Sequence, residues 1–112
     1  HTTGFVGGCQ YPGTYAASPH LSALPNRVYR VQSWSRNAGS TGQTTILFFD
    51  SKDQQIGAQF GTWTTDSWQY GADPPLMATS PANTTTLVIR YSLQTPSAYA
   101  DLDLLEVYLE PL

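Results

Sequence analysis

The stretch Arg27-Val-Tyr-Arg-Val-Gln-Ser-Trp-Ser-Arg36 indicates the fold class, because two kinds of side chain alternate along it. Successive side chains of a β-strand point to opposite faces of the sheet, so a period of two predicts a strand. One face combines an aromatic and a β-branched residue with two small ones: Tyr29, Val31, Ser33 and Ser35. The other face joins a flat aromatic to long hydrogen-bonding groups: Arg30, Gln32, Trp34 and Arg36. We expect the first face to line a core and the second to lie on the surface.

The remaining chain reads as further short strands separated by clusters of turn-forming residues. Thr44–Phe49 is apolar on both faces, which predicts a central strand. Gln55–Trp63 and Thr84–Leu93 each alternate, and Tyr99–Leu109 is the last strand of the set. No helix of three turns can be placed on this pattern. Short strands at this spacing are typical of sandwiches and barrels. We therefore predict an all-β fold, a two-sheet antiparallel β-sandwich of jelly-roll-like form, in which residues 1–112 make one module.

The alternation also predicts which side chains of two other strands point toward the core. In Thr84–Leu93 we expect Tyr91 to point inward with the apolar set, and Arg90 to point outward. In Gln55–Trp63 the apolar set is Ile56, Ala58 and Phe60, and we expect it to face the core. Gln59 and Trp63 fall on the opposite side of that strand.

Composition excludes several classes of partner. The chain of 112 residues has 40% hydrophobic but only 12% charged residues, with 12% aromatics, which is typical of an extracellular β-domain whose surface uses hydroxyls and amides. With five Lys and Arg and a net charge of −3, binding to nucleic acid is not expected. No apolar run of about 18 residues predicts a membrane span.

The cysteine count and the first residue bear on the cellular context. A single cysteine, Cys9, cannot form an internal disulfide, which leaves the compartment open, and we favour bacterial secretion. The chain begins at His1 without a methionine, so we interpret it as a processed or excised piece. We expect it to be a monomer.

Trp34 and Trp63 are the main candidate ligand-binding residues. A pyranose ring has an apolar C–H face on which an indole can stack, and a rim of hydroxyls that amide and guanidinium groups can bond. We therefore predict a sugar-binding platform of these two residues, with Trp68 extending it. The predicted hydrogen-bonding groups beside it are Gln32, Gln59, Arg30 and Arg90. The alternative is that the tryptophans belong to the core and that the arginines only solubilise the sheet.

The acidic residues and the histidines are weaker candidates for a functional site. Asp101 and Asp103 share one strand parity and suggest a calcium site, but such a site needs six to eight oxygen ligands. They also do not face one another across a cleft, as a pair of glycosidase carboxylates would. An N-terminal His1 with His20 as its partner would suggest a copper oxygenase, whereas a processing remnant is the simpler interpretation of His1.

Five motifs together resemble β-sandwich carbohydrate-binding modules of plant-cell-wall glycoside hydrolases, in the group around families 4, 16 and 22. Val28–Arg36 is similar to their strand with Tyr, alternating residues and Trp-x-Arg. Ile46–Gly57 resembles their strand, Asp turn and return. Their closing strands are matched by Thr65–Gln69, Ser80–Arg90 and Ala98–Val107. Those modules begin with an Asn-Gly-x-Phe-Glu strand. Thr2–Gly8 resembles this strand only faintly and lacks the glutamate. The cellulose-binding family 81 is the nearest compact family.

The resemblance implies a non-catalytic module that binds β-1,4- or mixed-linkage glucans, including cellulose, cello-oligosaccharides and xyloglucan. It also implies a covalently attached glycoside hydrolase domain, such as an endoglucanase, that the module targets to the cell wall. In those modules a structural calcium uses the missing acid with the residue matched by Asp101, so we expect no cofactor, and calcium at Asp101 is the alternative. A cell-surface adhesion or inter-domain sandwich without a sugar ligand is the main competing function.

Overall fold

A computed structural model describes most of the chain. The backbone is described for residues 2–9, 15–38, 42–63, 71–72, 74–93 and 99–111. Side chains are described for residues 17–35, 42–61, 71, 74–92 and 106–111.

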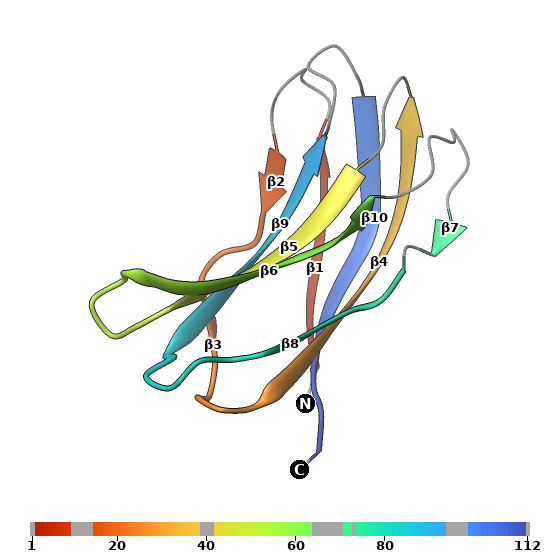
Figure 1. Cartoon of the computed structure of the whole chain (residues 1–112). Helices are drawn as coiled ribbons and strands as arrows, with labels where there is room; N and C mark the ends of the chain where they lie inside the picture. Colours follow the sequence, from red (N-terminus) through yellow and green to blue (C-terminus); the bar gives the residue numbers. More distant parts are fainter. Residues whose placement is uncertain are drawn as a thin grey trace.

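The described residues form two packed antiparallel sheets, which Figure 1 shows as two layers. Sheet A has the order β1-β10-β4-β7, with β8 also pairing with β4, and sheet B has the order β2-β9-β5-β6, with β3 also pairing with β9. The strands are β1 (Thr2–Cys9), β2 (Tyr15–Ala17), β3 (Leu21–Ser22), β4 (Val28–Ala38), β5 (Gly42–Phe49), β6 (Gln55–Trp63), β7 (Gly71–Ala72), β8 (Leu76–Thr79), β9 (Thr86–Leu93) and β10 (Tyr99–Leu109). The predicted all-β, jelly-roll-like sandwich is confirmed, and no helix that could cross a membrane occurs in the described part of the chain.

The two faces of β4 separate as its sequence alternation predicts. The inward side chains of Tyr29, Val31, Ser33 and Ser35 are all buried. Trp34, on the other face, is exposed over 42% of its surface. Strand β4 lies between β10 and the short strands β7 and β8, which makes it a central strand of sheet A.

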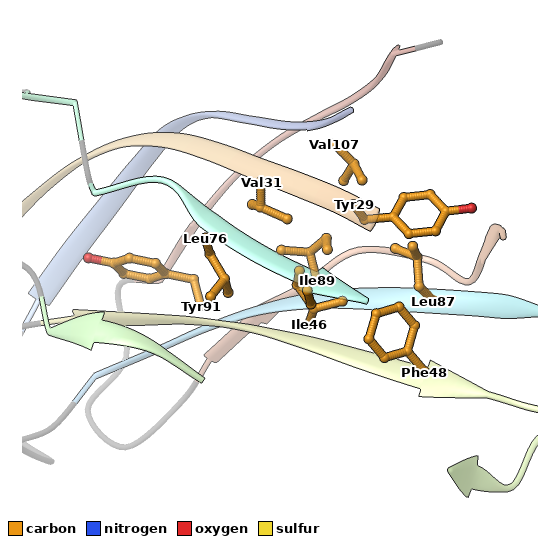
Figure 2. Packing of buried hydrophobic residues seen from close by; sticks show 10 residues of the cluster. Tyr29, Val31, Ile46, Phe48, Leu76, Leu87, Ile89, Tyr91 and Val107 are labelled. Atoms are coloured by element: carbon orange, nitrogen blue, oxygen red, sulfur yellow. The ribbon is translucent and has the colours of Figure 1, made fainter. Parts of the chain in front are cut away.

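The core lies between the sheets and takes apolar side chains from both (Figure 2). Sheet A contributes Tyr29, Val31, Leu76, Ala78 and Val107, and sheet B contributes Ile46, Phe48, Leu87, Ile89 and Tyr91. The prediction that β5 is a central strand is confirmed, because it pairs with β9 on one side and β6 on the other. Burial of such side chains stabilises the fold by about 25 cal/mol per Å² of apolar area removed from water.

Tyr91 fills the end of the core where β4 carries small residues. Its hydroxyl donates a hydrogen bond of 3.1 Å to the Oγ of Ser35 in the opposite sheet. Its ring also occupies the space beside Gly42, where an added Cβ would lie 1.9 Å from the Tyr91 oxygen. The inward placement predicted for Tyr29 and Tyr91 is therefore confirmed, and the small residues of β4 make room for Tyr91.

The predicted inward face of β6 is wrong at two of its three residues. Ala58 and Phe60 are exposed, and only Ile56 packs partly against the core. In the β5–β6 ladder the core residues Ile46 and Phe48 pair with Gln59 and Gly57, so the apolar residues Ala58 and Phe60 lie on the outer side. The inner side of β6 carries glycine at two positions where a side chain would meet neighbouring atoms. An added Cβ on Gly57 would approach a carbon of Pro81 to 2.9 Å, and the one on Gly61 would approach the carbonyl oxygen of Thr44 to 2.9 Å.

Candidate functional site

The structure divides the predicted platform between the two sheets. Arg30, Gln32 and Trp34 lie together on β4 of sheet A, whereas Arg90 lies on β9 of sheet B. Gln59 and Trp63 also belong to sheet B, on β6. Trp34 and Trp63 therefore belong to strands of different sheets. Strand parity predicts which face of a strand a residue occupies but not which sheet the strand joins. Trp68 lies outside the described residues.

Trp34 stands on the outer face of sheet A, opposite the buried side chains of β4. Its paired residues are Leu104 on β10 and Ala72 on β7. An indole that remains 42% exposed on a sheet has a surface available for a planar apolar ligand.

The same face carries polar residues in register beside Trp34. Gln32 pairs with Glu106, and Arg30 pairs with Tyr108, on successive outward positions of β4 and β10. Cross-strand partners lie about 4.5–5.5 Å apart between Cβ atoms, so these four side chains form one continuous patch. Together with Trp34 they make what we call the Trp34 face: Arg30, Gln32, Trp34, Glu106 and Tyr108.

Arg30 is held in position by one acidic and one aromatic neighbour, Glu110 and Tyr108. Its Nε donates a hydrogen bond of 2.7 Å to the Oε1 of Glu110, and its guanidinium carbon lies 4.5 Å from the centre of the Tyr108 ring. A guanidinium group over an aromatic ring is a favourable cation–π arrangement. The ion pair therefore orients Arg30 at the edge of the Trp34 face, and its partly exposed position limits what it contributes to stability.

Tyr108 is in turn tied to Glu106. The Tyr108 hydroxyl donates a hydrogen bond to a carboxylate oxygen of Glu106. This bond raises the pKa of the phenol, because loss of the phenol proton would break the bond and place two negative charges together. The positive charge of Arg30 opposes this rise in pKa. The network presents a carboxylate, a phenol and a guanidinium in fixed relative positions, which suits the bonding of several hydroxyl groups.

Glu106 and Tyr108 were missed by the sequence interpretation, although their signal is visible in the last strand. Leu105, Val107 and Leu109 alternate with Glu106 and Tyr108, and Val107 is buried in the core. The alternation therefore identifies the outward pair, but only the pairing of β10 with β4 places it beside Gln32 and Arg30.

The sheet B residues of the predicted site lie apart from the Trp34 face. Arg90 is half-buried and pairs with Ala17 on one side and Thr45 on the other. Gln59 is exposed and pairs with Ile46. The backbone of Trp63 pairs with that of Gln43, and the Trp63 side chain lies outside the described part.

The candidate metal residues are only partly described. Asp101 pairs through its backbone with Gly8 and Arg36, while the side chains of Asp101 and Asp103 lie outside the described set. Among the side chains that are described, no three His, Cys, Asp or Glu residues gather as metal ligands would. His20 is exposed, with its Nδ1 3.2 Å from the Thr86 hydroxyl and its ring centre 4.7 Å from that of Phe49, and His1 lies outside the described residues.

Solved structures with the same fold include carbohydrate-binding modules. The CBM22-1–GH10 part of Clostridium thermocellum xylanase 10B, in complex with xylohexaose, superimposes with a TM-score of 0.66 at 9% identity, over 88% of this chain and 19% of that one. A family 61 carbohydrate-binding module in complex with β-1,4-galactotriose gives a TM-score of 0.52 at 13% identity, over 97% of this chain and 70% of that one. A family 16 carbohydrate-binding module gives 0.53 at 15% identity, over 84% and 72%.

The same sandwich also occurs outside carbohydrate-binding modules. The enzymatically active domain of tailspike protein 4 from bacteriophage CBA120 gives a TM-score of 0.67 at 12% identity, over 97% of this chain and 19% of that one. This chain thus spans about a fifth of the length of the tailspike and xylanase chains. No protein-family model and no curated protein matches the sequence. The chain therefore has a β-sandwich fold shared with carbohydrate-binding modules, and at these identities the likeness concerns the fold alone.

Proposed function

We propose that this chain is a non-catalytic carbohydrate-binding module that holds a β-1,4- or mixed-linkage glucan on the Trp34 face. It would act in a secreted protein and target an attached glycoside hydrolase domain to plant cell wall. The single observation that carries this proposal is the exposed Trp34 indole beside four oriented polar side chains on one sheet face.

The chemistry of the Trp34 face supports a neutral polysaccharide. Stacking on Trp34 would bury the apolar face of one sugar ring, and Gln32 and Glu106 would bond equatorial hydroxyls next to it. Arg30 and Tyr108 are already oriented by their own contacts, so less side-chain freedom is lost on binding. One stacking position with a few hydrogen bonds is consistent with micromolar or weaker affinity.

The site on the Trp34 face replaces the platform expected from the sequence. Trp34, Gln32 and Arg30 remain proposed ligand-binding residues, and Glu106 and Tyr108 join them. Arg90, Trp63 and Gln59 lie on the other sheet and are not included.

Affinity electrophoresis is the experiment that tests the function. The protein is run in native gels that contain β-glucan, xyloglucan, xylan or β-1,4-galactan, with and without a chelator. Retardation in the β-glucan or xyloglucan gel supports the proposal. Retardation only by galactan or xylan would show that the chain binds carbohydrate but that the proposed polysaccharide is wrong. Loss of retardation with chelator would identify a required metal ion. Free migration in every gel would favour an adhesion or inter-domain role.

The position of the site is tested with cellohexaose and isothermal titration calorimetry. We expect Trp34→Ala to weaken binding by at least about tenfold, because it removes a stacking contact worth about 1.4 kcal/mol or more. Phe60→Ala is the matched control, since Phe60 is an exposed aromatic on the other sheet. If Phe60→Ala weakens binding and Trp34→Ala does not, the ligand is bound by sheet B and the proposed site is wrong.

A further inference from the structure

Strand β6 forms an edge of sheet B whose shielding is limited to bulges at its two ends, where its ladder with β5 shifts register opposite Gln43–Thr45 and Phe48–Phe49. Edge strands expose unpaired N–H and C=O groups, and natural proteins shield them with short strands, proline, charges or bulges. The other edge of sheet B consists of the short strands β2 and β3 on either side of Pro19. One edge of sheet A consists of the short strands β7 and β8 on either side of Pro74 and Pro75, and the other is β1, with a bulge between Phe5 and Gly7.

Strand β6 is long and has no charged residue or proline. It covers the nine residues Gln55–Trp63 and pairs regularly with β5 from Gly57 to Phe60. No described strand pairs with its other side, and Figure 1 shows it at the border of the sheet. The consecutive residues Ala58, Gln59 and Phe60 are all exposed, and Phe60 is exposed over 57% of its surface. The exposed backbone of this edge is therefore available to another strand.

We propose that β6 pairs with β6 of a second copy of this chain, antiparallel and with the two-fold axis at Gln59. The segment Gly57-Ala-Gln-Phe-Gly61 is nearly the same in both directions, with a glycine at each end and an apolar residue on each side of Gln59. Antiparallel pairing about Gln59 places each Phe60 opposite Ala58 of the other copy, and each Gly57 opposite Gly61. A self-complementary patch of this kind is what a two-fold symmetric interface requires.

The side chains of the pair are compatible with burial. Phe60 and Ala58 lie on the same outer side, so each phenyl ring would cover the exposed alanine of the other copy. No like charges meet, because the segment is uncharged. The proposed dimer differs from the monomer expected from the sequence.

The symmetry has a consequence that rests on the proposed function. A two-fold axis between paired antiparallel strands is perpendicular to the sheet, so both copies keep sheet A on the same side of the dimer. Both Trp34 faces would then be turned to one side, and the dimer could bind one polysaccharide surface through two sites.

Analytical ultracentrifugation of the full chain tests the association. We expect the weight-average mass to rise toward twice that of one chain as the concentration increases from micromolar to millimolar. A mass that stays at one chain over that range overturns the proposal. The measurement contains no sugar, so its result does not depend on the proposed function.

Variants at Gln59 test the position of the axis. Gln59→Lys and Gln59→Glu each place two like charges opposite one another, so each should weaken the dimer by at least about tenfold. An equimolar mixture of the two variants should restore association, because lysine then meets glutamate. Gln54→Lys is the matched control, since Gln54 is an exposed residue of the adjoining turn, and it should leave the dimer unchanged. A dimer that survives in Gln59→Lys, or a mixture that remains monomeric, would show that a different surface or register is used.

Discussion

Gly42 and Tyr91 show how a single residue determines the packing at one end of the core. The Tyr91 ring reaches across to the Oγ of Ser35 and occupies the space in which a side chain at Gly42 would lie. An added Cβ would come within 1.9 Å of the phenol oxygen and 2.1 Å of the adjoining ring carbon, so the ring would have to leave its position.

We predict that Gly42→Ala lowers the free energy of unfolding by about 3 kcal/mol, at the upper end for overpacking in a core. Urea unfolding followed by fluorescence measures the change. Gly71→Ala is the matched control, because an added Cβ there has no atom within 4 Å, and it should change stability by less than about 0.5 kcal/mol. Equal effects of the two substitutions would show that the Tyr91 ring does not limit Gly42.

Tyr108 carries the pH dependence expected of the Trp34 face. Its hydrogen bond to Glu106 raises the pKa of the phenol above the usual 10.0, so the folded state binds the phenol proton more tightly than the unfolded state. The resulting stabilisation is present below pH 10.0 and is lost as the pH rises through the raised pKa.

We predict that the wild type loses stability more steeply than Tyr108→Phe as the pH rises above 10.0. Urea unfolding at a series of pH values gives both curves, and the other tyrosines cancel in the comparison. Parallel curves would mean that the bond to Glu106 does not persist in solution.

At the scale of elements, the turn between β5 and β6 is built on Asp50. Its Oδ1 accepts hydrogen bonds from the backbone N–H groups of Lys52 and Gln54, at 2.9 and 3.0 Å. Asp53 has a φ of 57°, a left-handed conformation that aspartate adopts more readily than most residues. The Asp turn expected from the sequence is therefore confirmed.

We predict that Asp50→Ala lowers the free energy of unfolding by about 1–2 kcal/mol, because two backbone donors lose their charged partner. Lys52→Ala, at an exposed position of the same turn, should cost less than about 0.5 kcal/mol. Thermal or urea unfolding compares the stability of the two variants. An Asp50→Ala variant as stable as the wild type would show that water replaces the carboxylate without loss of stability.

The strands differ in how well the alternation of their side chains predicts which residues face the core. It succeeds for β4 and for Leu87, Ile89 and Tyr91 of β9, since each of these strands lies between other strands and its inner side must fill the space between the sheets. It fails for β6, whose apolar residues Ala58 and Phe60 point outward. At Gly57 and Gly61 this edge strand has no space for a side chain on its inner side, so hydrophobicity is a poor guide to its orientation.

At the scale of the whole molecule, the topology decides which surface residues meet. Neighbouring strands along the chain often change sheets: β4 belongs to sheet A, β5 and β6 to sheet B, and β7 and β8 again to sheet A. Trp34 and Trp63 therefore belong to different sheets, although the sequence pattern places each opposite the apolar residues of its strand. Glu106 and Tyr108, far along the chain, instead lie beside Gln32 and Arg30.

The sequence by itself determined the fold class, the central strands, the Asp50 turn and the exposure of Trp34. These features follow from local rules, because side-chain alternation and turn chemistry act over a few residues. Only the tertiary structure decided the sheet to which each strand belongs, the pairing of β10 with β4, and the unpaired edge of β6. Those features depend on hydrogen bonds between segments distant in sequence, and hydrophobic periodicity within one strand carries no information about its partner.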